Sequence, residues 1–92
     1  MIYLTENIVV DADRLNYIVG KPKNEKDKHG KDYVRIIHPT YHGTLAEAVK
    51  WAVGIAMRSK VSDGTITELR DFIVWYERIS ADFEKRLAPL ES

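Results

Sequence analysis

The stretch GTLAEAVKWAVGIAMRSK, residues 43–60, sets the fold class of this chain. It opens with a capping box, in which the Thr44 hydroxyl accepts from the backbone N–H of Glu47 and the Glu47 side chain reaches back. Further on, the positions that break the apolar surface share one narrow stripe: Glu47, Lys50, Gly54 and Arg58. A helix is predicted from Thr44 to about Ser59, and such an apolar helix must be covered on two sides.

A second capping box, Thr65 with Glu68, predicts a second helix that reaches Leu87, because Pro89 stops it soon afterwards. Its main apolar row alternates in steps of three and four, broken only at Ser80: Ile66, Leu69, Ile73, Tyr76, Phe83, Leu87 and Leu90. A second row lies beside it: Phe72, Trp75 and Ile79. The short connection makes the two helices antiparallel neighbours.

The first forty residues alternate as strands do. One run, IYLTENIVV, contains a turn or bulge at residues 5–7. Further runs cover residues 14–21 and 31–39, and Pro39 should end the last of them. The predicted fold is therefore α+β, with a small antiparallel sheet of about three strands packed against an antiparallel two-helix hairpin. We expect one domain over residues 1–92, with a β-meander over 1–40 and a helical hairpin over 44–88.

Between the second and third strand runs lies KPKNEKDKHGKD, residues 21–32. It separates two alternating strands whose faces match, so we interpret it as a long, mobile hairpin loop from Lys21 to Gly30. Its five lysines are interleaved with Glu25, Asp27 and Asp32, which lowers the local positive field. The length exceeds what a hairpin needs, and such loops often carry contacts.

Charge and composition narrow the function classes. Fourteen basic residues balance fourteen acidic ones, and each half of the chain is also nearly balanced. A dedicated nucleic-acid binder would show a basic excess. The chain has no cysteine and no signal-peptide pattern, and its apolar runs are too short to span a membrane. We expect a cytoplasmic protein.

Few residues are candidates for catalysis or for metal binding. His38 and His42 are four apart, but Pro39 breaks regular structure between them, and a third metal ligand is not evident by spacing. The Asp11 and Asp13 pair is typical of a surface turn. Because nucleophile, phosphate-loop and metalloprotease motifs are also missing from the sequence, we expect neither catalysis nor a metal or cofactor.

At the passage into the first helix, an aromatic, a glycine and a [ST]LxxA motif follow one another: Tyr41, Gly43, Thr44, Leu45 and Ala48. With a β-meander before them and a helical hairpin after, the layout resembles small uncharacterised proteins encoded by phages and prophages of Gram-positive bacteria. The resemblance implies a role in binding a host protein in the bacterial cytoplasm. Inhibitors of defence systems such as CRISPR–Cas effectors belong to this role class.

The leading hypothesis is therefore a non-enzymatic protein-binding module, with an inhibitor of a bacterial defence system as its narrower form. The candidate partner contacts are near the sheet edge and the loop: Lys28, Lys31, Tyr33, Arg35, Tyr41 and His42. One alternative is a nucleic-acid-binding accessory protein that uses the lysine-rich loop.

The other alternative is a homodimeric structural or assembly subunit. In this hypothesis the end of the second helix near Phe83 and Leu87 overhangs the sheet and forms a dimer seam. The same end can instead fold against its own sheet.

Overall fold

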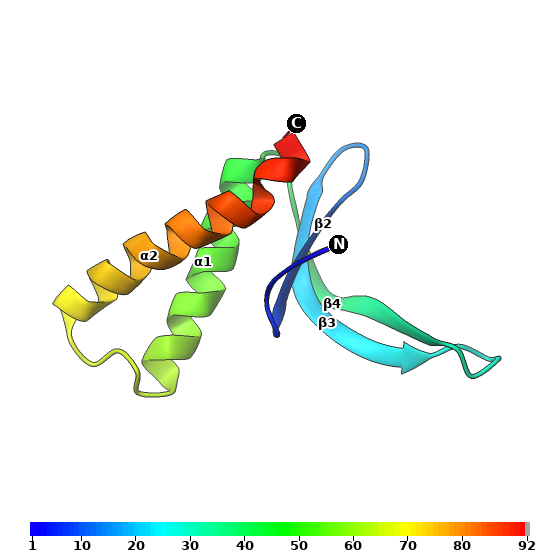
Figure 1. Cartoon of the computed structure of the whole chain (residues 1–92), viewed down its shortest axis with the longest axis horizontal. Helices are drawn as coiled ribbons and strands as arrows, with labels where there is room; N and C mark the ends of the chain where they lie inside the picture. Colours follow the sequence, from blue (N-terminus) through cyan, green and yellow to red (C-terminus); the bar gives the residue numbers. More distant parts are fainter. Residues whose placement is uncertain (92) are drawn as a thin grey trace.

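A computed structural model describes residues 1–91 and confirms the α+β class (Figure 1). The elements in chain order are β1 (Ile2–Thr5), β2 (Ile8–Ala12), β3 (Tyr17–Lys26), β4 (Asp32–His42), α1 (Leu45–Ser62), α2 (Leu69–Leu87) and the short 3-10 helix η1 (Ala88–Glu91). The described strands form one antiparallel meander in the order β1-β2-β3-β4. Helices α1 and α2 lie on one side of it.

The sheet has four strands over the described residues, where about three were predicted. The difference lies in the first apolar run. Its polar interruption, expected as a turn or bulge, is a tight turn at Glu6 and Asn7 that separates β1 from β2. The backbone N–H of Asn7 donates to the Thr5 hydroxyl at 3.1 Å, which stabilises this reversal.

The core lies between the sheet and the helices. The sheet contributes Val10 and Val19, both fully buried. Helix α1 meets them with a row of small residues that includes Ala48 and Ala52, so its backbone lies close to the sheet. Its neighbouring face, with Val53, packs toward α2, as the two-sided apolar surface of α1 requires.

The Thr44 half of the predicted capping box is confirmed, because the Thr44 hydroxyl accepts from the Glu47 backbone N–H at 3.2 Å. The helix runs to Ser62, about one turn beyond the predicted end. Asp63 and Gly64 close it, donating their backbone N–H groups to the carbonyls of Ser59 at 2.9 Å and Val61 at 3.3 Å, respectively.

The second predicted capping box is wrong. Helix α2 begins at Leu69, and its cap residue Glu68 makes no side-chain capping bond. The Thr65 backbone N–H donates instead to Asp63 Oδ1 at 2.8 Å. Ile66 is buried, and its N–H donates to the Lys60 carbonyl at 3.1 Å, so tertiary packing holds residues 65–67 outside the helix.

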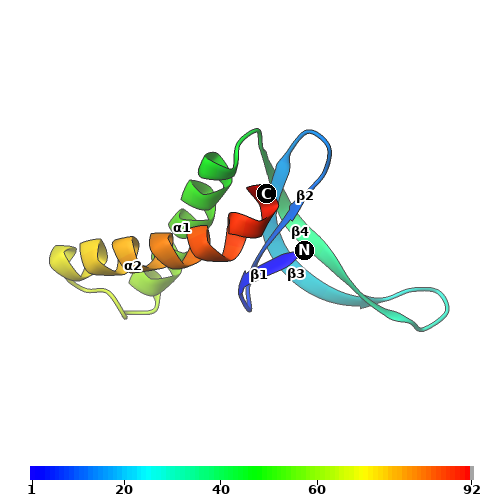
Figure 2. The same cartoon turned by 45° about the horizontal axis from the view of Figure 1, so that its top comes forward.

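Of the two placements considered for the end of α2 near Phe83 and Leu87, the structure shows the one without an overhang, because both side chains are buried in the core. This end of α2 lies beside the sheet, and α2 contacts β1. The opposite end of α2 projects away from the sheet and diverges from α1 toward the connecting loop (Figure 2). On α2, the large apolar side chains left exposed are therefore those of its first half.

None of the helices described within residues 1–91 is long and apolar enough to cross a membrane. Among the same residues, His, Asp and Glu side chains form no group of three that is placed to hold a metal ion.

Candidate functional site

The most prominent surface feature is a two-stranded arm, which we define as residues 21–37. Strand β2 pairs with β3 only as far as Gly20, through the Val9–Gly20 pair. Strands β3 and β4 continue to pair beyond it, out to Lys26 and Asp32. The arm therefore projects about 20 Å past the rest of the sheet, at roughly 3.3 Å per residue, away from the helices (Figures 1 and 2).

The lysine-rich stretch is not the long mobile loop that the sequence predicted. Most of it is strand, and the connection between strands is residues 27–31. Asp27 organises this turn, because its Oδ1 accepts from the backbone N–H of His29 at 2.8 Å and of Lys31 at 2.9 Å. Gly30 has a φ of +78°, a value that glycine adopts without strain.

The arm joins the sheet at a β-bulge. Val19 pairs with Thr40 and Lys21 with Ile37, so Gly20 alone faces both His38 and Pro39. The prediction that Pro39 ends the strand is wrong, because the bulge places Pro39 where a ladder hydrogen bond is not required, and β4 continues to His42. His38 has a left-handed φ of +52°, which bends the strand at this point.

Gly20 is required at this joint. A Cβ built on it would overlap the Ile36 side chain and lie 2.9 Å from the carbonyl oxygen of Ile37. The two strands of the arm therefore approach each other more closely at Gly20 than any other residue would allow.

The register divides the arm into two faces. One face carries Lys21, Lys23, Glu25, Tyr33, Arg35 and Ile37, and we call it the basic face. The other face carries Pro22, Asn24, Lys26, Asp32, Val34 and Ile36. On this second face Lys26 and Asp32 neutralise each other at 3.7 Å, so the unbalanced positive charge of the strands lies on the basic face.

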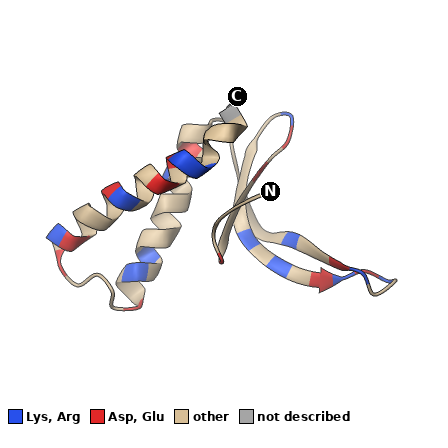
Figure 3. Cartoon of the chain, in the orientation of Figure 1, with Lys and Arg blue, Asp and Glu red and all other residues tan. Residues whose placement is uncertain are grey.

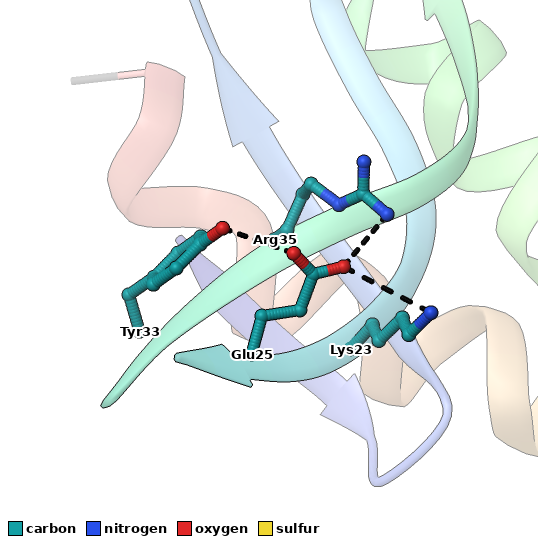
Figure 4. A network of polar contacts seen from close by, with 4 residues as sticks. All are labelled: Lys23, Glu25, Tyr33 and Arg35. Atoms are coloured by element: carbon teal, nitrogen blue, oxygen red, sulfur yellow. Dashed lines mark hydrogen bonds and ion pairs between the residues drawn. The ribbon is translucent and has the colours of Figure 1, made fainter. Parts of the chain in front are cut away.

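Glu25 ties the basic face together (Figure 4). Its Oε1 lies 2.7 Å from Arg35 Nη2 and 3.9 Å from Lys23 Nζ, and its Oε2 accepts from the Tyr33 hydroxyl at 2.9 Å. The Tyr33 hydrogen bond lowers the pKa of Glu25, helped by the charges of Arg35 and Lys23, and the same bond raises the pKa of Tyr33. The Glu25 side chain is only 23% exposed, against 54% for Arg35, so the cations are the outer groups.

The arm and the rest of the chain carry opposite charges. Residues 21–37 hold six basic and three acidic residues, whereas the remaining residues hold eight basic and eleven acidic ones. Figure 3 shows the basic positions along both strands of the arm. The chain is neutral in total, but the arm has a net charge of +3 and the remaining residues, which we call the body, have a net charge of −3.

The structure divides the predicted contact residues into separate groups. Tyr33 and Arg35 share the basic face, and Lys28 and Lys31 lie in or beside the turn at its tip. Tyr41 lies eight residues farther along β4 than Tyr33, about 26 Å away in an extended strand.

His42, at the far end of β4, faces inward. Its Nε2 lies 2.8 Å from the Thr40 hydroxyl and its ring lies 5.8 Å from that of Trp51. Tyr41 and His42 therefore do not belong to the same surface as the arm.

The protein contacts predicted from the sequence left out Lys21, Lys23 and Glu25, although the two lysines belong to the stretch assigned to the nucleic-acid alternative. The signal was present, because these residues continue the odd-numbered face of β3 that starts with Tyr17 and Val19. Because residues 21–30 were interpreted as a loop, the alternation of side chains along them was not used.

No family model matches the chain, and neither the curated proteins nor the solved structures that were compared with it give a match.

Proposed function

We propose that this chain is a non-enzymatic protein-binding module that contacts an acidic surface of its partner through the basic face of the arm. The observation that carries the proposal is the separation of charge: a projecting arm with a net charge of +3 stands on a body with a net charge of −3. Charged, exposed groups on a projecting element favour encounter with a surface of opposite charge.

The arrangement on the arm favours a protein over a nucleic acid. A carboxylate, Glu25, lies among the cations and is bonded to Lys23, Tyr33 and Arg35. A phosphate backbone that follows the arm would approach this carboxylate and then the negative body. The free side of β4, the outer strand of the described sheet, also offers backbone groups to an extended segment of a partner.

The proposal includes no catalytic step, and local structure accounts for the pKa shifts of the described residues. Shifted pKa values occur at Asp13, Glu25, Tyr33 and Asp63. The pKa values of Asp13 and Asp63 are lowered chiefly by hydrogen bonds within their own turns. The pKa values of Glu25 and Tyr33 are shifted chiefly by the hydrogen bond between these two side chains in the arm, so each shift has a structural cause.

The test compares the wild-type chain with the triple variant Lys21→Glu, Lys23→Glu, Arg35→Glu as bait in bacterial lysates. A matched control, Arg14→Glu, Lys50→Glu, Lys85→Glu, changes the net charge equally but leaves the arm intact. We expect a stoichiometric protein with wild type and control, and a loss of at least about 10-fold in its affinity with the arm variant. Equal capture by all three baits contradicts the proposal.

Nucleic-acid binding is the second candidate, favoured by the same positive arm. Fluorescence anisotropy with DNA and RNA oligonucleotides distinguishes it, because phosphate contacts weaken steeply between about 50 and 200 mM salt. If such binding is found and is abolished by the arm variant, the arm is a nucleic-acid element and the protein-binding proposal is wrong.

The narrower role, inhibition of a bacterial defence system such as a CRISPR–Cas effector, rests on the resemblance in sequence layout to phage accessory proteins. It is tested by expressing the chain in a host whose defence system blocks a phage. Restored plaque formation that depends on the arm supports the role, and unchanged immunity across several defence systems contradicts it.

A further inference from the structure

The first half of α2 presents an apolar row to solvent. Leu69 is 75% exposed, Ile73 50% and Tyr76 41%. These side chains lie on the part of α2 that projects beyond the sheet (Figures 1 and 2). Large apolar side chains gathered at one place on a small protein indicate an interaction surface.

A groove continues this row toward α1. It has a volume of about 360 Å³ and is lined mainly by apolar groups, among them Met57, Val61, Phe72 and Tyr76. The groove lies between the two helices, where α2 diverges from α1 toward the connecting loop. Tyr76 belongs to both the exposed row and the groove, so the two form one surface.

The spacing of the row is that of a helix-pairing seam. Leu69, Ile73, Tyr76 and Ser80 follow one another at steps of four, three and four, as the two core positions of a heptad do. Arg70 and Glu77 are seven residues apart and therefore flank the seam on the same side. They carry opposite charges.

We propose that two copies of the chain pair through residues 69–80 of α2, antiparallel and related by a two-fold axis. In this register Ile73 packs against the partner's Tyr76, and Leu69 lies opposite the partner's Ser80. Arg70, whose Nε contacts Glu68 Oε2 of its own chain at 2.9 Å, then also faces the partner's Glu77. The two-fold axis repeats each contact, so the seam gains two ion pairs between the copies.

The charges of Arg70 and Glu77 favour a second copy of the chain as the partner on this surface, with its α2 antiparallel. In antiparallel helix pairs, flanking positions of the same type face each other, which brings Arg70 to Glu77. A parallel pair brings opposite flanks together, so Arg70 and Glu77 would not meet and the ion pairs would be absent. The surface is thus complementary to itself in one orientation, the property that a symmetric dimer interface requires.

Burial sets the ends of the seam. At one end the helix itself begins at Leu69, and at the other the next seam position, Phe83, is already buried in its own chain. The seam therefore spans residues 69–80, or roughly 17 Å at 1.5 Å per residue. An interface this short lies below the usual size of stable complexes, so a dissociation constant in about the micromolar range is expected.

Sedimentation equilibrium of the full chain from about 1 µM to about 1 mM tests the dimer. We expect a reversible monomer–dimer equilibrium that Ile73→Asp shifts at least about 10-fold toward monomer. The control Leu15→Asp adds the same charge at an exposed leucine on the far turn of the sheet and should leave the equilibrium unchanged. A wild-type chain that stays monomeric throughout the range overturns the proposal.

A charge exchange tests the register. Arg70→Glu and Glu77→Arg should each weaken the dimer, because each places like charges across the seam, and the double variant should restore it. A double variant as weak as the singles overturns the antiparallel pairing. Circular dichroism checks folding, and if Ile73→Asp unfolds, Leu69→Lys carries the same test. These variants lie outside the arm, so failure here and failure of the proposed function are separate outcomes.

Discussion

The joint of the arm gives the sharpest prediction about stability. In Gly20→Ala the new methyl group would overlap Ile36 Cγ2 and press on the carbonyl oxygen of Ile37 at 2.9 Å. Because the carbonyl belongs to the paired strand, it cannot rotate away as a side chain would. Forcing an extra methyl group into a packed site costs about 1–3 kcal/mol, whereas alanine recovers about 0.4–1 kcal/mol by restricting the unfolded chain.

The net expectation for Gly20→Ala is a loss of about 1–2 kcal/mol in the free energy of unfolding. Urea denaturation followed by circular dichroism measures it. With a urea dependence of about 1 kcal/mol per molar for a chain of this size, the midpoint should fall by about 1–2 M. Gly43→Ala is the matched control, because a Cβ there meets nothing within 4 Å, and it should change stability by less than about 0.5 kcal/mol.

A double-mutant cycle with Ile36→Ala separates the two clashes. Removing the Ile36 side chain frees space for the alanine methyl group, so the double variant should lose less than the sum of the singles, with a coupling of about 1 kcal/mol. The remaining loss reports the contact with the Ile37 carbonyl. A Gly20→Ala variant as stable as wild type, or a coupling near zero, refutes the account of the joint.

Three further predictions concern local contacts. Thr44→Ala should lower the free energy of unfolding by about 1 kcal/mol in urea denaturation, and Thr44→Ser should retain most of it, because serine keeps the capping oxygen. Tyr33→Phe should move the pKa of Glu25 back toward its ordinary 4.5 in an NMR titration. Since that pKa is lowered in the folded chain, the Glu25 contacts stabilise the arm above the unfolded pKa and are lost as pH falls through the folded pKa. Asp27→Ala should speed hydrogen exchange at the two amides that its carboxylate binds, with little change in global stability.

The sequence predicted those features whose causes are local. The Thr44 cap and the apolar pattern of α1 lie within one helix, and both are confirmed. Pro89 ends α2 near Leu87 as expected. The α+β class follows from the change of period between the two halves of the chain.

The failures have tertiary causes. Ile66 packs into the core, and this contact outweighs the capping potential of Thr65. Pro39 fits inside a strand because a bulge faces it with Gly20, an arrangement that depends on pairing between strands. The predicted apolar row of α2 is buried only at Phe83 and Leu87, near the sheet, whereas Leu69 and Ile73 stay exposed at the end that projects away from it.

The site was only partly predictable for a similar reason. Lysines typical of a loop also occur on exposed strands, and only the pairing partners distinguish the two cases. Tyr33 and Arg35 were found because their own strand alternates clearly, whereas Glu25 becomes part of the site only through residues of the opposite strand.

The separation of charge between arm and body affects how the molecule approaches other macromolecules. Its formal net charge is zero, so a distant ion exerts almost no net pull on it. The positive arm and negative body nevertheless give the molecule a dipole moment, and in a non-uniform field such a molecule turns before it is drawn in. Near a negatively charged macromolecule it would arrive arm first, with its helices pointing away. Orientation would thus be selected during diffusion, before any contact forms.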